Sequence, residues 1–460
     1  MSLTGLLAFV LILGAAVVLH EFGHFIVAKL LGIRVETFSV GFGKRIWGRR
    51  WGTTDYRLSL IPLGGYVKLG GDDSNAGLEE GEGEEIPERE RFDLRPRWHK
   101  FLVGVAGPVM NILTAVAIPL VTAMTVGVPA APPPSPLVGR VESGGAAEAA
   151  GVRPGDRIVQ YGSVREPEWK QIEGDAMLSP DREISLVVRR DGQDLPLTLK
   201  PRPFKVKTGE TVGDLGMLPD LGVVPVVRAV VEGGPAAEAG LKPGDKILKV
   251  NGRTAQSNDQ VAASIQGSKG PITLAVERGG QETELTVGER RLEEGRVGIA
   301  FAPPPVRQLG LAAATSYSVG LNLDIIAMTG KALGQVFTGD RSVRDTLAGP
   351  IGIAQASDVA VRDSGWGGFF WMLTILSLNL GIFNLLPIPV LDGGMIFMLF
   401  VEGALAWVGI KLSTAMRERI QQVGFVFLLL LMGFVIINDV TKVASRWVAP
   451  ADPPAATEQK

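Results

Sequence analysis

The feature that most constrains this chain is a metal-binding pattern inside an apolar run. The run covers residues 3–31, and its second half reads His20-Glu21-Phe22-Gly23-His24. In a helix, residues four apart lie on one face, so both imidazoles would face the same side. An H-E-x-x-H pattern on a helix is typical of a zinc site with a glutamate as general base. A chance match is the alternative, but two of only 3 histidines have this spacing.

Apolar composition places the chain among membrane proteins. Of its 460 residues, 46% are hydrophobic, and crossing a bilayer takes about 20 apolar residues. Four stretches qualify as transmembrane helices, the third of them interrupted: residues 1–31, 101–128, 366–400 and 420–438. Reading the first as a cleaved signal peptide is disfavoured, because no basic residues precede it and cleavage near Ala15 would cut just ahead of His20.

Charge and cysteine content narrow the function further. The net charge is −2, which gives no general attraction to nucleic acid, so no nucleic-acid partner is expected. There is no cysteine, so histidine and carboxylate side chains must hold any zinc. Ionisable groups are costly in a membrane and therefore indicate function there.

The distribution of lysine and arginine predicts the orientation in the membrane. These residues are abundant in the loop 32–100 near both adjoining spans, so this loop and the short loop 401–419 are expected to be cytoplasmic. Residues 129–365 and the tail 439–460 then face the other side. The acidic, glycine-rich stretch 71–93 is expected to be a flexible loop.

Residues 38–69 combine aromatic and β-branched residues with glycines, which predicts a β-hairpin lying against the membrane. Its exposed edge would capture an extended peptide as an added strand. The alternative, equally weighted here, is a hairpin that only packs on the helices.

The second span contains the sequence GPVMN at residues 107–111. Small residues allow helices to pack closely, and a buried asparagine needs a partner. The sequence leaves open whether Asn111 serves packing or contacts an active site.

An internal repeat follows the proline-rich linker 129–136. Residues 144–158 read GGAAEAAGVRPGDRI and residues 233–247 read GGPAAEAGLKPGDKI. Both resemble bacterial, circularly permuted PDZ domains, expected at 129–220 and 221–302. The resemblance implies peptide grooves near two tripeptides, Leu215-Gly216-Met217 and Val297-Gly298-Ile299. Alternatively, the grooves are empty and the domains act only as bulky screens.

Residues 303–365 contain an apolar stretch at 309–328 that Asn322 and Asp324 interrupt. An amphipathic helix on the outer membrane surface is preferred to a fifth span. Residues 347–353, which read LAGPIGI, are expected to be a turn leading back to the membrane.

The third span breaks in the sequence NLLPIPVLDGG, residues 384–394. Pro387, Pro389 and the glycine pair interrupt a helix, and irregular backbone at membrane depth indicates a site covered by protein. A catalytic zinc needs three protein ligands, and Asp392 is the only well-placed third ligand beside His20 and His24. The alternative is that Asp392 only caps the following helix.

Together, HEFGH, GPVMN and NLLPIPVLDGG resemble the site-2 protease family of intramembrane metalloproteases. The tandem repeats resemble its RseP-type bacterial branch. The resemblance implies one Zn²⁺ per chain, held by His20, His24 and Asp392, with Glu21 as the catalytic acid and base. It also implies substrate positioning by a further set: Asn384, Asn379, Pro387 and Pro389.

The family further implies the biological setting. Expected substrates are single-span membrane proteins, such as anti-sigma factors and remnant signal peptides, first shortened outside the membrane by an upstream, site-1-type protease. The expected location is the bacterial inner membrane, with the PDZ domains on the periplasmic side and the lipid bilayer around the spans.

The sequence thus predicts a polytopic α-helical membrane protein with four transmembrane helices, a membrane-associated β-hairpin and two extracytoplasmic α+β PDZ domains. Two rival functions remain. A metal transporter would not need Glu21 or the repeats, and an anchored PDZ scaffold would not need HEFGH.

Overall fold

A computed structural model describes most of the chain. The described residues are 3–71, 86–130, 135–142, 144–206, 211–220, 224–255, 258–266, 268, 270–289, 297–302, 306–340, 342–346, 348–410 and 413–448. The chain divides into two compact units. We call Met1–Thr125 with Leu309–Lys460 the helical unit, and Val126–Val206 with Glu210–Gln308 the repeat unit.

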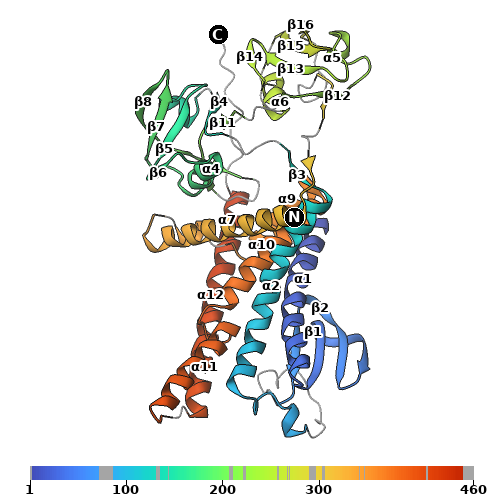
Figure 1. The fold of residues 1–460 in the computed structure, drawn as a ribbon, viewed down its shortest axis with the longest axis vertical. Helices are drawn as coiled ribbons and strands as arrows, with labels where there is room; N and C mark the ends of the chain where they lie inside the picture. The colour runs from blue at the N-terminus through green and yellow to red at the C-terminus, as the bar shows by residue number, and fades with distance from the viewer. Residues whose placement is uncertain are drawn as a thin grey trace. The chain divides into compact units, whose positions relative to one another are not determined.

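Long helices form most of the helical unit (Figure 1). They are α1 (Leu3–Leu30), α2 (Arg97–Thr125), α7 (Leu311–Phe337), α9 (Pro350–Ser364), α10 (Trp366–Asn384), α11 (Asp392–Trp407) and α12 (Thr414–Val448). A single 3-10 turn (Glu88–Glu90) and the short α8 (Val343–Thr346) complete its described helices. By length and composition, α1, α2, α7, α10 and α12 are each able to cross a membrane.

Glycines let three of these helices approach closely. A Cβ at Gly23 of α1 would collide with the Ala106 carbonyl of α2, and one at Gly381 of α10 would lie 2.9 Å from the Pro108 carbonyl. Dispersion and close packing are what hold helices together in lipid, where burial of apolar groups gives little driving force. The glycines therefore allow α1, α2 and α10 to form one tight group.

The predicted hairpin is present as β1 (Val35–Trp51) and β2 (Thr54–Leu69), and it starts slightly earlier than expected. Both strands bend, so that the first part of β1 pairs with two different parts of β2, and the first part of β2 pairs with two different parts of β1. Phe38 pairs with Val67 on one side and with Tyr56 on the other, and Tyr56 also pairs with Arg49. The stretch around Val67 is therefore one edge of the sheet. The sheet packs on α1, where the Phe25 ring lies 5.2 Å from that of Phe38.

The interrupted third span is two helices, α10 and α11, joined by residues 385–391. Helix α11 continues to Trp407 and α12 begins at Thr414, so most of the loop expected at 401–419 is helical. In Figure 1, α7 runs crosswise past α2, α10 and α12, at the opposite end of the helical unit from α11. Its Ser318 hydroxyl donates to the Val116 carbonyl at 2.6 Å, which anchors it to α2. The surface location of α7 stays a prediction.

The turn expected at 347–353 is wrong, because α9 begins at Pro350. Proline is favoured in the first helical turn, where its missing N–H costs nothing. The buried Asp439 carboxylate of α12 accepts hydrogen bonds from the N–H groups of Gly349, Ile351 and Gly352. A side chain far along the chain thus satisfies the first N–H groups of this helix.

The repeat unit contains two domains whose described elements follow the same order, except that the first has two additional strands, β9 and β10, which pair with each other. The first has β4 (Val138–Val141), α3 (Ala146–Ala149), β5 (Arg157–Tyr161), β6 (Val164–Arg165), α4 (Trp169–Leu178), β7 (Ile184–Arg190), β8 (Gln193–Leu199), β9 (Arg202–Lys205), β10 (Thr211–Asp214) and β11 (Met217–Pro219). The second has β12 (Val227–Val230), α5 (Pro235–Glu238), β13 (Lys246–Val250), β14 (Arg253–Thr254), α6 (Asn258–Gln266), β15 (Ile272–Arg278), β16 (Gln281–Val287) and β17 (Ile299–Phe301).

Sheet topology matches between the two domains. The four-stranded sheets have the orders β6-β5-β7-β8 and β14-β13-β15-β16, and each domain adds a two-stranded pair, β4 with β11 or β12 with β17. A separate short pair, β3 (Val128–Pro129) with β18 (Val306–Arg307), brackets both domains. This α+β architecture is compatible with PDZ domains, which remain a prediction.

One ion pair recurs in both domains and explains the repeated P-G-D sequence. Asp156 and Asp245 are each 1% exposed. Asp156 accepts from the Arg190 guanidinium at 2.7 Å, and Asp245 accepts from Arg278 at 2.7 Å. The hydrogen bond from Arg278 is the main cause that holds the pKa of Asp245 below its usual value. A buried carboxylate with such a partner contributes to stability as a pair.

Replacing Asp245 with asparagine should lower the free energy of unfolding by about 1.5–3 kcal/mol at neutral pH, the range for a hydrogen bond to a charged group. The folded-state pKa of Asp245 is lowered, so its contribution is present above the unfolded-state pKa of about 3.9 and is lost as pH falls through the folded-state value. The difference in free energy of unfolding between wild type and Asp245→Asn should therefore shrink below about pH 4.

Thermal unfolding of the full chain in detergent at several pH values measures this. The control is Asp194→Asn, because the Arg189–Asp194 pair has the same chemistry but is half exposed; no measurable change is expected there. Equal losses in both variants would contradict the role of the buried pair.

Candidate metal centre

Three predicted ligands come together in the helical unit. His20 and His24 lie on α1, and Asp392 is the first residue of α11. The two Nε2 atoms are 3.3 Å apart. Asp392 Oδ2 lies 2.9 Å from His20 Nε2, and Oδ1 lies 3.5 Å from His24 Nε2. Two imidazole nitrogens and one carboxylate, from residues widely separated in sequence, thus face a common point.

These residues fit a zinc ion. Tetrahedral zinc with bonds of about 2.0–2.2 Å spaces its ligand atoms roughly 3.3 Å apart, close to the observed separations. Asp392 Oδ2 is buried and, despite its 2.9 Å approach to His20, has no hydrogen bond of good geometry among the described residues. A Cβ on Gly107 of α2 would collide with both imidazoles. The glycine therefore leaves the space that the ligands surround.

The break between α10 and α11 places Asp392. Gly393 and Gly394 are buried, and a Cβ on either would collide with carbonyl groups of Leu386 or Ile388. The irregular loop can therefore fold back against the first turn of α11. Val390 in this loop has a φ of 83°, a strained conformation for a β-branched residue. Such strain persists only where surrounding structure enforces it.

The alternative role for Asp392, capping α11, is not what the structure shows. The N-cap residue is Leu391, and no side-chain cap hydrogen bond is present. The carboxylate instead faces the two imidazoles. Its negative charge at a helix N-terminus is still favourable, because the N-terminal end of a helix dipole is positive.

Helix α2 contacts the outer nitrogen of each histidine, which is Nδ1, the ring nitrogen on the side away from Asp392. His24 Nδ1 lies 2.7 Å from the Val103 carbonyl oxygen, to which it donates. His20 Nδ1 lies 3.2 Å from the side-chain amide of Asn111. Asn111 therefore contacts a predicted ligand, and whether it acts on the metal centre or only packs between helices stays a prediction. A buried polar residue in the second span was the signal that pointed to it.

Glu21 lies beside the ligands and also contacts the sheet. Its Oε2 accepts a hydrogen bond of 3.1 Å from the backbone N–H of Val67 in β2. The edge of the sheet at Val67 therefore faces α1. A carboxylate in this place can accept a proton from a water molecule near the three ligands.

The predicted substrate-positioning residues lie in and around the helix break. Asn384 ends α10, and its Nδ2 is 3.2 Å from His20 Nε2, so its amide borders the ligand cluster. Asn379 is half-buried and lies in the same helix, slightly more than one turn before Asn384. Pro387 is exposed, whereas Pro389 packs against Gly424 of α12. Their roles stay predictions.

The predicted peptide-binding residues of the repeat unit belong largely to its core. Leu215, Met217 and Val297 are buried among hydrophobic side chains, and Ile299 is half-buried. The backbone is partly engaged as well: the N–H of Gly216 donates to Asp214 at 3.1 Å, and the carbonyl of Gly298 accepts from Val231 at 2.9 Å. Peptide binding at either place stays a prediction.

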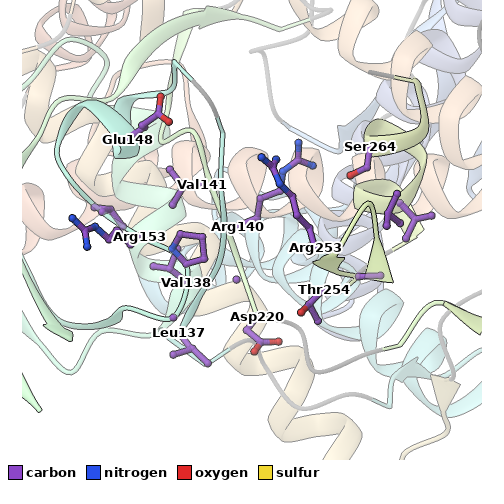
Figure 2. Close-up of a pocket in the computed structure, with 18 of the residues that line it drawn as sticks. Leu137, Val138, Arg140, Val141, Glu148, Arg153, Asp220, Arg253, Thr254 and Ser264 are labelled. Carbon is purple, nitrogen blue, oxygen red and sulfur yellow. The ribbon is translucent and has the colours of Figure 1, made fainter. Parts of the chain in front are cut away.

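The repeat unit also contains a hollow of about 900 Å³, and Figure 2 shows side chains that line it. Leu137, Val138 and Arg140 of the first domain line it, together with Arg253, Thr254 and Ser264 of the second. None of the six predicted groove residues lines it. The hollow is therefore separate from the grooves that the sequence predicts.

Known proteins resemble this chain over nearly its whole length. The sequence pattern of Peptidase family M50 matches residues 8–431. The regulator of sigma-E protease RseP of Salmonella typhimurium is 32% identical over 464 residues, covering 96% of this chain and 99% of that protein. The Escherichia coli protein of the same name is 32% identical over 461 residues, covering 95% and 98%.

A Vibrio cholerae protein described as a proposed zinc metalloprotease is 32% identical over 465 residues, covering 95% of this chain and 98% of its own. Both the family pattern and these relatives extend over nearly the whole chain. The chain therefore belongs to peptidase family M50, the site-2 protease family of membrane metalloproteases.

Proposed function

We propose that this metalloprotease cleaves peptide bonds within the transmembrane segments of single-span membrane proteins, using one zinc ion per chain. The observation that carries the proposal is the meeting of His20, His24 and Asp392 on apolar helices, with Glu21 beside them. Membership of a peptidase family removes the two rival functions, metal transport and scaffolding.

Each residue of the centre has a distinct task. His20, His24 and Asp392 would hold zinc, which when bound supplies a Lewis acid for activating water and polarising a carbonyl. Glu21 accepts the proton of the attacking water and passes it to the departing amine. The Asn384 amide is placed to donate to the substrate carbonyl, a contact worth about 2.7–4 kcal/mol in another protease.

The sheet supplies a route for the substrate. A helical segment must unwind before cleavage, because its carbonyl groups are already hydrogen-bonded within the helix. Addition of the unwound segment to an open strand edge replaces those hydrogen bonds. The Val67 N–H at the β2 edge donates to Glu21, so a substrate strand that pairs along this edge and displaces that contact would bring its peptide bonds to the metal centre.

The proposed biological role is regulated intramembrane proteolysis in the bacterial inner membrane. The substrates would be anti-sigma factors or remnant signal peptides, already shortened by another protease. The repeat unit, on the periplasmic side, would exclude proteins that still carry a bulky outer domain. The names of the relatives, which refer to regulation of sigma-E, support this class of substrate.

Glu21→Gln should abolish cleavage of a reconstituted single-span substrate while zinc content stays at the wild-type level. Glutamine cannot accept the proton, and general-base catalysis contributes roughly 10²–10⁴-fold. Substrate cleavage in proteoliposomes and metal analysis measure the two effects. Glu36→Gln, a change in the half-exposed pair with Lys68, is the control and should retain activity. Wild-type cleavage by Glu21→Gln would refute the assignment.

Asp392→Asn should reduce zinc content as well as cleavage, because the neutral amide is a poorer zinc ligand than a carboxylate. Metal analysis after dialysis against a fixed chelator concentration measures this. The content should fall toward that of the double variant His20→Ala with His24→Ala. An unchanged content would remove Asp392 as a ligand.

Deletion of residues 137–302 should allow cleavage of substrates that retain their outer domain. Because β3 and β18 lie outside the deleted range and pair through Val128 and Arg307, a short linker can join the cut ends. Rates for full-length and pre-shortened substrates, compared in membranes, measure the effect. Continued rejection of full-length substrates, with normal cleavage of shortened ones, would rule out size exclusion.

A further inference from the structure

We propose that Asn111 is a positioning residue of the metal centre, whose side-chain oxygen accepts a hydrogen bond from His20 Nδ1 and so directs the Nε2 lone pair to the metal. The inference rests on the proposed zinc site and adds a residue outside the ligand set. It concerns how a side chain of α2 fixes which ring nitrogen of His20, on α1, carries the proton and which is available to the metal.

The first observation is an unsatisfied buried atom. Asn111 is 0% exposed. Its Nδ2 lies 3.2 Å from His20 Nδ1, while its Oδ1 is buried without a hydrogen-bond partner among the described residues. An unsatisfied buried acceptor costs about 1–3 kcal/mol. The amide oxygen and nitrogen occupy nearly the same space, so the hydrogen-bond network decides which one faces His20.

The second observation concerns the proton of the neutral imidazole. A neutral ring carries one N–H, and the nitrogen that binds a metal must keep its lone pair. His20 Nε2 is the nitrogen that faces Asp392 and His24, so the proton belongs on Nδ1. Nδ1–H opposite the Asn111 NH₂ group would place two donors face to face. Rotating the amide by half a turn places Oδ1 at this position and gives the unsatisfied oxygen its partner.

In the opposite orientation of the Asn111 amide, His20 cannot bind a metal through Nε2. With the amide nitrogen donating to Nδ1, the ring proton lies on Nε2, the nitrogen that is 2.9 Å from Asp392 Oδ2. The lone pair that zinc needs is then absent, and Oδ1 stays unsatisfied. The orientation of the Asn111 amide is thus linked to metal occupancy.

The third observation is the arrangement of α2. Val103, Gly107 and Asn111 are spaced by four residues and lie on one face of the helix. The Val103 carbonyl accepts from His24 Nδ1 at 2.7 Å, Gly107 makes room for both rings, and Asn111 meets His20. One face of α2 therefore provides an acceptor, a gap and a second acceptor for the histidine pair. Metal-binding histidines generally need such partners on their other nitrogen.

The alternative is that Asn111 only packs between helices, and a pair of substitutions separates the two roles. Asn111→Leu keeps the branched shape and the number of side-chain heavy atoms and removes the acceptor, whereas Asn111→Asp keeps an oxygen that can accept from Nδ1–H. Asn322→Leu is the matched control. Asn322 is also a buried asparagine against α2, where its amide donates to the Ala115 carbonyl at 3.0 Å, but it is not at the metal centre.

The experiment measures zinc affinity of the full-length protein in detergent by competition with a chromophoric chelator, without any proteolysis. Asn111→Leu should weaken zinc binding about 10–100-fold, the usual cost of losing such a partner. Asn111→Asp should restore the affinity to within a few-fold of wild type, and Asn322→Leu should leave it unchanged. Visible spectra of the cobalt-substituted proteins should differ from wild type in Asn111→Leu alone.

The outcomes are distinct. Wild-type zinc affinity in Asn111→Leu would overturn the positioning role while leaving the proposed protease intact. Equal weakening in Asn111→Leu, Asn111→Asp and Asn322→Leu would show a packing role and overturn it as well. Failure of the wild-type protein to bind zinc would instead refute the proposed metal centre itself. Thermal unfolding of the metal-free proteins checks that each variant is folded.

Discussion

Placing a carboxylate and two imidazoles among apolar helices is the constraint on which the rest of this structure depends. Such groups are costly in a membrane unless they are paired or bind a metal. Pairing requires that α1, α2 and α11 approach closely, and the glycines at 23, 107, 393 and 394 make that approach sterically feasible. The polar side chains of the metal centre therefore require small residues on the helices and loop around them.

The same constraint explains why the centre is supported from several directions. Helix α2 contacts the outer nitrogens of the histidines, β2 contacts Glu21, and α12 packs on the loop before Asp392 through Gly424. Each support comes from a different part of the chain. A ligand set built this way keeps its geometry because its neighbours are themselves held by packing.

Local patterns predicted the ligands better than their surroundings. HEFGH and the Pro-rich break before Asp392 pointed to three residues that the structure brings together, because helical spacing and chain breaks are local properties. The partner of Asn111 was not predictable, since helical periodicity gives a face but no neighbour. Helix α9 was missed because Asp439, distant in sequence, caps it. The double pairing of β1 and β2 likewise depends on bends that residue preferences do not specify.

The insertion of the repeat unit between the two halves of the helical unit has a consequence for synthesis. His20 and Asn384 are 364 residues apart, and translation proceeds at about 5–20 residues per second. The histidine pair therefore waits roughly 20–70 s in the membrane before Asp392 is made. With the proposed ligands, a nascent chain has no complete ligand set until Asp392 has been made. With this ligand set, the order of synthesis would keep the incomplete chain from hydrolysing proteins in the membrane where it is assembled.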